Sequence, residues 1–315
     1  MDASLETRSQ EESFRWLVSN VARLYAAHGE AIGTPLLIEP TGAFFPDSLE
    51  SSAAGLHALL RRIMSYTPLS DSLNVRVALV DTEGEAGGGC GGGACGTSGE
   101  SAQIRGGIVE EAEGYVVLLH PGDVGDPILL TASLARNAGT LTHLEGDLPL
   151  RPDEAGALSE ITASALGFGV LLTSASCIYK KGCGGMRMHR GTALSLEEHA
   201  LLLVTIARVH GHKLASATKH LEVTQKEAID RAIAFVDSNA EVIKQLQGSP
   251  EMLVDGIFAV NPPRSWLGRL FSKRPDAHTS PFGETPVAQR HVSRSAEEQA
   301  KIDEMRRLVD EALGS

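Results

Sequence analysis

The sequence is poor in aromatic residues and cysteines, and each scarcity excludes a class of protein. Phe, Trp and Tyr make up 4% of 315 residues, so Leu, Val, Ile and Ala must supply most of the core. Four cysteines are too few for a disulfide-stabilised scaffold of this length. We expect no membrane-spanning helix, which needs roughly 18 consecutive uncharged apolar residues.

Basic residues are also scarce relative to acidic ones. The chain has 28 Lys and Arg against 40 Asp and Glu, which gives a net charge of −12 and a pI near 5.4. An acidic balance of this size argues against nucleic acid as a partner. The acidic start of the chain lacks the basic and apolar regions of a signal peptide, so we expect a cytoplasmic protein.

Hydrophobic spacing predicts helices interleaved with a small sheet in the first half of the chain. Helices are expected over 10–28, closed by His28-Gly29, and over 51–66. Strands are expected over 36–38, 74–80, 102–110 and 115–119.

The chain is predicted to be helical from residue 127 onward. Helices are expected over 127–143, 153–177, 195–210, 212–221 and 224–246. Ser195 with Glu198, and Thr224 with Glu227, have the spacing of capping boxes. The fold class is therefore α+β, with a small N-terminal sheet and its helices packed on a C-terminal helical bundle.

Changes in composition divide the chain into three parts. Residues 1–248 form one α+β domain, interrupted by a loop over 84–99 with nine glycines in sixteen positions. Residues 249–295 form a Pro-rich basic linker or tail, and 296–315 contain an amphipathic helix. Within 261–295 there are six Lys or Arg and two Asp or Glu, so this tail is basic on an acidic protein.

Several short motifs occur in the order found in one protein family. They are Phe44-Phe-Pro-Asp47, His120-Pro121 after a strand, Asp126-Pro127 at a helix start, Leu166-Gly-Phe-Gly-Val170, and Leu196-Glu-Glu-His-Ala-Leu-Leu-Leu203. In this order they resemble uncharacterised bacterial proteins that are predicted to be zinc metallopeptidases of the gluzincin type. The resemblance covers roughly residues 14–240 and implies a zincin-like fold.

The resemblance also implies where a metal site would be, and this chain departs from it at every position. In that family a His-Glu-x-x-His helix binds zinc and activates water. Here Arg136 and Thr140 stand at the two His positions and Asn137 stands at the Glu position. The third ligand aligns with Gly156, and the Ser159 and Glu160 that follow replace its partners. A guanidinium cannot bind a cation, and an amide cannot act as a general base.

Other residues are candidates for a rebuilt metal site. His143 and Glu145 follow the first of these helices, and His210 lies at a helix end beside His212. The alternative without a metal is that His143 and Glu145 lie in a solvated turn. His210 and His212 would then lie at a helix terminus, which favours histidine because of the helix dipole. His199 is interpreted as a satisfied surface or core histidine.

The four cysteines have no zinc-ribbon spacing. Cys90 and Cys95 lie in the Gly-rich loop, and Cys177 and Cys183 are six positions apart. They could converge on one metal ion or respond to oxidants. The structural interpretation is favoured, with Cys177 as a small core residue. The basic residues around 180–190 are interpreted as a solvated helix connection.

The basic tail carries one apolar cluster. Trp266, Leu267, Leu270 and Phe271 would share one helical turn, with basic residues at its edge. A cluster of this kind docks on its own domain or on a partner protein. A third alternative is weak contact of the 264–274 segment with a membrane surface.

These observations favour a catalytically inactive, metallopeptidase-like domain that acts in binding or assembly, with a protein partner or through self-association. We expect no cofactor, and zinc is the only one that the sequence leaves as an alternative. A metal-dependent hydrolase with a rebuilt site and a cysteine-based metal- or redox-responsive protein are the alternatives.

Overall fold

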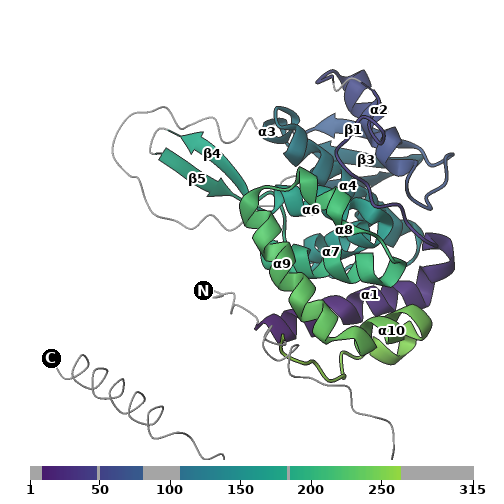
Figure 1. Cartoon of the computed structure of the whole chain (residues 1–315). Helices are drawn as coiled ribbons and strands as arrows, with labels where there is room; N and C mark the ends of the chain where they lie inside the picture. The colour runs from purple at the N-terminus through teal and green to yellow at the C-terminus, as the bar shows by residue number, and fades with distance from the viewer. Residues whose placement is uncertain (1–8, 48–49, 81–106, 183–184, 264–315) are drawn as a thin grey trace, which may run out of the picture. The chain divides into compact units, whose positions relative to one another are not determined.

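The computed structural model describes residues 9–47, 50–80, 107–182 and 185–263. The chain divides into two compact units, 1–269 and 270–315, and all the described residues belong to the first. The described residues form a mixed α+β structure that is mostly helical, with one three-stranded and one two-stranded sheet (Figure 1).

The first helix, α1 (Gln10–Ile32), is longer than predicted. Its N-terminus has a capping box, in which Ser9 Oγ accepts from the Glu12 amide and the Glu12 carboxylate accepts from the Ser9 amide. The predicted end at His28 is a kink, with φ −134° and ψ 15°, and the helix resumes until Gly33 ends it at φ 59°. Phe14, a residue of its apolar face, is fully buried.

The three-stranded sheet has the order β1-β3-β2. Strand β1 (Val75–Leu79) runs parallel to β3 (Gly114–Leu119), which pairs antiparallel with β2 (Gly107–Glu111). Val75, Val117 and Leu119 are buried, so one face packs on the core. Helix α2 (Ala53–Met64), capped by Ser52, packs near β1. These predicted elements are confirmed, apart from residues 102–106, which lie outside the described part of the chain.

Further helices make up most of the remaining described residues. They are α3 (Pro121–Val124), α4 (Pro127–Glu145), α5 (Ala155–Ala163), α6 (Gly169–Ala175), α7 (Leu196–His210), α8 (Leu214–Ala217), α9 (Val223–Ser238) and α10 (Ala240–Gly248), with short 3-10 turns at Thr218–His220 and Pro250–Leu253. Asp126 caps α4 and Ser195 with Glu198 caps α7, as the sequence predicted.

The predicted helix over 153–177 is not continuous. A π-helical turn, Ser164–Phe168, separates α5 from α6, and within it Gly167 adopts φ 103°. Its carbonyl accepts from the Ile38 amide at 3.0 Å, and a Cβ there would lie 1.9 Å from the Leu36 carbonyl oxygen. The segment 36–38 was predicted as a strand, and this is wrong, because its backbone packs against this turn instead of entering a sheet.

This broken helix also corrects the expectation that no segment could span a membrane. Residues Ala155–Ala175 are long and apolar enough by composition, but 83% of their apolar window is buried inside the protein. Burial of this kind is typical of a central core helix, and Phe168 within it is fully buried.

The predicted helix over 224–246 is also interrupted. Asn239 ends α9 with φ −114° and ψ 33°, and its side-chain amide donates to the carbonyls of Phe235 and Asn261. The capping box at its start is formed by Glu222 and Gln225, not by Thr224 and Glu227. Gln225 is buried and also donates to two carbonyls at the end of α6, which fixes the register of the helix start.

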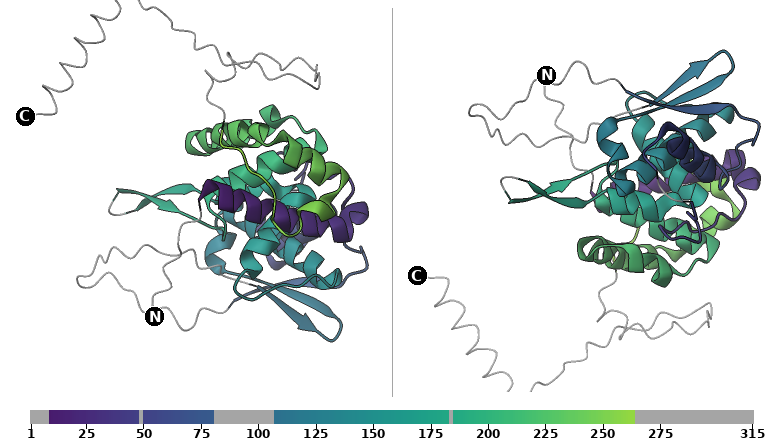
Figure 2. Two further views of the ribbon diagram at one scale, coloured as in Figure 1. Left: turned by 90° about the horizontal axis from the view of Figure 1, so that it is seen from below. Right: turned by 90° about the horizontal axis from the view of Figure 1, so that it is seen from above.

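The segment interpreted as a solvated helix connection is a β-hairpin. Strands β4 (Ile178–Gly182) and β5 (Gly185–His189) pair antiparallel and project from the helical body (Figures 1 and 2). Lys180 anchors the hairpin through an ion pair with Asp126 at 2.7 Å. The basic residues therefore lie on a protruding arm.

Residues 249–261, which the sequence assigned to the linker, pack on the body. Leu253 is buried against the core, and Arg15 of α1 donates to the Phe258 carbonyl. The predicted Gly-rich loop over 84–99, the tail beyond residue 263 and the helix predicted within 296–315 lie outside the described residues.

The tightest helix contact is the crossing of α4 and α5 at Gly139, and it generates a prediction. A Cβ at Gly139 would lie 2.1 Å from the Ser159 carbonyl oxygen, which is main chain and cannot move aside. Gly139→Ala is therefore expected to lower the free energy of unfolding by about 2–3 kcal/mol. Chemical denaturation measures this loss.

Gly29→Ala is the matched control, because a Cβ there meets nothing closer than 3.9 Å. Its free energy of unfolding should stay within about 0.5 kcal/mol of the parent protein. Equal stability of the two variants would contradict the close crossing.

Candidate functional site

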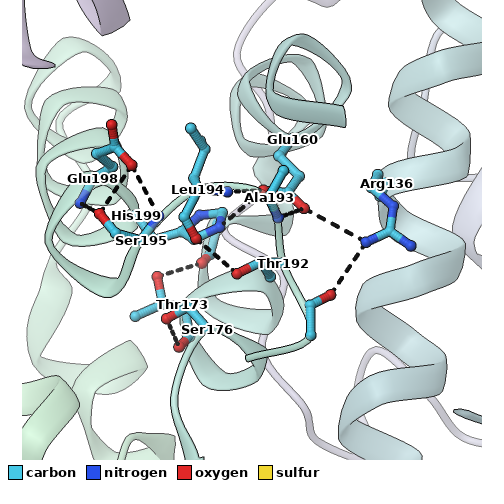
Figure 3. Close-up of polar contacts among 12 residues, drawn as sticks. Arg136, Glu160, Thr173, Ser176, Thr192, Ala193, Leu194, Ser195, Glu198 and His199 are labelled. Atoms are coloured by element: carbon cyan, nitrogen blue, oxygen red, sulfur yellow. Dashed lines mark hydrogen bonds and ion pairs between the residues drawn. The ribbon is translucent and has the colours of Figure 1, made fainter. Parts of the chain in front are cut away.

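Residues that the resemblance aligned with a metal site lie at the crossing of α4 and α5. Arg136, Asn137 and Thr140 project from α4, and Glu160 projects from α5. Arg136 and Glu160 meet in a buried cluster that also includes residues 191–194 and His199 of α7, and we call this cluster the Glu160 network (Figure 3).

Glu160 is the centre of the network. Its side chain is 0% exposed, and its two oxygens accept from the main-chain amides of Ala193 at 2.8 Å and Leu194 at 2.9 Å. A buried carboxylate without partners would cost several kcal/mol of desolvation. Main-chain donors on the loop before α7 therefore provide part of the compensation.

Arg136 approaches the carboxylate from the side of α4. Its Nη1 lies 3.5 Å from Glu160 Oε1 and donates to the Gly191 carbonyl at 3.2 Å, while Nη2 contacts Ser133 Oγ at 3.4 Å. The residue is 5% exposed, so both charges of the pair are shielded from solvent. The guanidinium thus joins α4 to both α5 and the loop.

His199 completes the network from α7. It is 1% exposed, and its Nε2 lies 3.2 Å from Glu160 Oε2. The capping box of Ser195 and Glu198 fixes the start of α7, and the Thr192 hydroxyl donates to the Leu194 carbonyl. These contacts hold the donor amides in place (Figure 3).

The charge state of Glu160 follows from these contacts. Burial alone raises the pKa of its carboxyl, but His199, the positive charge of Arg136 and the Leu194 amide oppose that effect. The net pKa lies below the ordinary value of 4.5. Glu160 is therefore a carboxylate at neutral pH.

The other two α4 positions make different contacts. Thr140 donates to Ser159 Oγ at 2.8 Å across the helix crossing. Asn137 is buried, and its Nδ2 finds no hydrogen-bond partner among the described residues. Gly156 begins the turn of α5 that precedes Glu160 and has no side chain to offer a ligand.

The network contains one carboxylate, one imidazole and one guanidinium, and the guanidinium cannot bind a metal ion. Across the described part of the chain, no group of three or more His, Cys, Asp or Glu side chains is placed to hold a metal. The donor set at the α4–α5 crossing therefore does not fit zinc.

The candidates for a rebuilt site have separate partners. His143 Nε2 lies 2.7 Å from Thr162 Oγ1, and the Glu145 carboxylate accepts from the Tyr115 hydroxyl. His210 Nε2 lies 2.8 Å from the Tyr25 hydroxyl oxygen, and burial together with the neighbouring His212 lowers the pKa of His210.

Cys177 is 3% exposed and packs in the core at the end of α6. The other three cysteines, Cys90, Cys95 and Cys183, lie outside the described residues, as does the apolar tail cluster of Trp266, Leu267, Leu270 and Phe271.

Sequence reasoning missed that His199 and the loop amides belong to the same site. One signal pointed to it: Glu160 is the only charged residue over 156–176, and a lone carboxylate in an apolar helix needs buried partners. Which residues supply them could not be inferred, since main-chain donors have no signature in the sequence.

Comparison of the chain with protein-family models, with curated proteins and with solved structures found no match.

Removing one partner from the network should be costly. Arg136→Met leaves the Glu160 carboxylate buried without its cation, and Glu160→Gln leaves the guanidinium without its anion and replaces one acceptor oxygen by a donor. Each is expected to lose about 3–5 kcal/mol of unfolding free energy in denaturant titrations. Arg208→Met, which breaks the exposed pair with Asp237, should lose at most about 1 kcal/mol.

The network should also contribute to the acid sensitivity of the fold. Because the folded pKa of Glu160 is depressed, its contribution is complete above pH 4.5 and is lost as the pH falls from there through the folded pKa. The stability difference between the parent protein and Glu160→Gln should therefore shrink on acidification over this range. A constant difference would contradict a lowered pKa.

Proposed function

We propose that this protein is a catalytically inactive, metallopeptidase-like domain that acts in binding or assembly. The observation that carries the proposal is the Glu160 network. Where the resemblance implies a metal and its water, this chain has a guanidinium, a carboxylate and two main-chain amides that satisfy one another inside the core.

Catalysis by a group of this kind is hard to reconcile with its surroundings. A general base must reach its substrate within hydrogen-bond distance, directly or through one water. Glu160 is fully buried, and its oxygens already face two amides, Arg136 and His199. Its contacts are those of a structural carboxylate.

The hairpin β4–β5 is the surface that we assign to binding. Tyr179 and Met188 lie opposite each other in its register, so they share a face, and they are 48% and 64% exposed. Val223, at the start of α9 next to the Tyr179–Thr224 contact, is 69% exposed. We assign these three exposed apolar side chains to the contact surface.

The hairpin is also suited to pairing. Within the described residues its sheet contains only β4 and β5, so each strand has a free edge. A two-stranded hairpin is marginally stable alone and gains from additional strands. We propose that a second copy of the chain supplies them, through a symmetric contact between hairpins.

Metal content and rebuilding of the site test the loss of catalysis. Purified protein is expected to hold much less than one zinc per chain in elemental analysis. The combined variant Arg136→His, Asn137→Glu, Thr140→His is expected to remain without peptidase activity, because Gly156 supplies no third ligand. Circular dichroism must first show that the variant is folded, because it removes the Arg136–Glu160 pair.

Stoichiometric zinc in the parent protein would contradict the proposal. Its loss on His143→Ala would then favour a rebuilt hydrolase site, and its loss on substitution of the cysteines by serine would favour a thiolate site.

Self-association is tested by sedimentation velocity. The parent protein should form a dimer as its concentration rises, and Tyr179→Ser with Met188→Ser should shift it to the monomer, because the shared apolar face is lost. Leu36→Ser is the control, since Leu36 is also an exposed apolar residue, at 60%, but is not part of the hairpin. A parent protein that stays monomeric would refute the hairpin contact.

A further inference from the structure

A cavity of about 350 Å³ lies on a different part of the α4–α5 pair from the Glu160 network. Its walls come from Asn20, Arg23 and Leu24 of α1, from His143 at the end of α4, from the turn that contains Arg151, and from α5. The volume is within the range of small-molecule sites. Nothing in the proposed binding function uses this cavity.

The charge of the cavity is opposite to that of the protein. Arg23 and Arg151 are its lining charges, and no carboxylate lines it, although the chain carries 40 acidic and 28 basic residues. By contrast, the cavity beside β2 and β3 is lined by four glutamates and no basic residue. The lining of the α1–α4–α5 cavity therefore favours an anion.

Arg23 is the charge available to a ligand. Arg151 is already ion-paired with Glu154. Arg23 donates to Asn20 Oδ1 at 3.3 Å and makes no ion pair with any residue that the structure describes. An exposed arginine at the rim presents a planar donor that matches a carboxylate.

His143 also lines the cavity. The residue is 7% exposed, and its Nε2 contacts the Thr162 hydroxyl. Burial lowers the pKa of His143, while the carbonyls of Leu158 and Leu148 act in the opposite direction.

The remaining wall is apolar. Leu24, Leu148, Pro149, Leu158 and Ile161 line it. A fully hydrated inorganic anion gains nothing from such a wall, whereas the hydrocarbon body of an organic acid does. We propose that this cavity binds a small monocarboxylate with a compact apolar body, its carboxylate paired with Arg23.

The test uses full-length protein and isothermal titration with isovalerate, benzoate and phenylacetate. Their uncharged amides, which keep the apolar body, and inorganic phosphate, which keeps only the charge, are the comparison probes. At least one carboxylate should bind, and its amide should bind about tenfold or more weakly, because the charge-assisted bonds are lost.

Variants assign the binding to the cavity. Arg23→Gln should weaken the carboxylate about tenfold or more, and Arg23→Lys should restore part of the loss. Arg231→Gln is the control, since Arg231 is an exposed arginine on α9 that pairs with Glu197. The imidazole resonances of His143 should shift on titration in the parent protein.

Three results would overturn the proposal. One is the absence of binding by all three acids up to about 10 mM, which corresponds to less than about 3 kcal/mol of binding free energy. Another is equal binding of acid and amide, and the third is unchanged affinity in Arg23→Gln. None of these results bears on the metal content or on the hairpin contact.

Discussion

The burial of one carboxylate constrains the arrangement of the whole helical body. Glu160 lies in the most apolar segment of the chain, so its desolvation must be offset within the core. The offsetting groups come from α4, from the loop before α7 and from α7 itself. These segments can pack only where Arg136, the loop amides and His199 all reach Glu160. The close approach at Gly139 allows α4 to come near enough for that contact.

Local signals in the sequence predicted most of the elements correctly, and long-range contacts explain the failures. Asp126 before Pro127 and Ser195 before Glu198 marked helix starts because capping depends on residues a few positions apart. The π-turn at Gly167 packs against the main chain of Leu36 and Ile38, far away in the sequence, so periodicity could not reveal it. The hairpin β4–β5 was missed because its short, basic, Gly-containing strands have the composition of a loop.

The same distinction between local and long-range signals applies to the candidate site. The resemblance identified Arg136 and Glu160 as individual positions, and the composition around Glu160 required a buried partner. That the two residues pair with each other follows from the helix crossing, and the role of Ala193 and Leu194 follows from their main chain. His199 was judged a satisfied histidine, and the structure places it within the core beside Glu160.

The network is better understood as a positioning device than as a source of net stability. A buried ion pair gains about as much as its desolvation costs, and apolar residues of the same volume often stabilise a core equally well. What the charged pair adds is specificity, because the Glu160 carboxylate meets Arg136 and the two loop amides together only in this arrangement of α4, α5 and the loop. The same two helices also form walls of the cavity that contains His143. The Arg136–Glu160 pair joins α4 to α5 and so helps to hold those two walls in register.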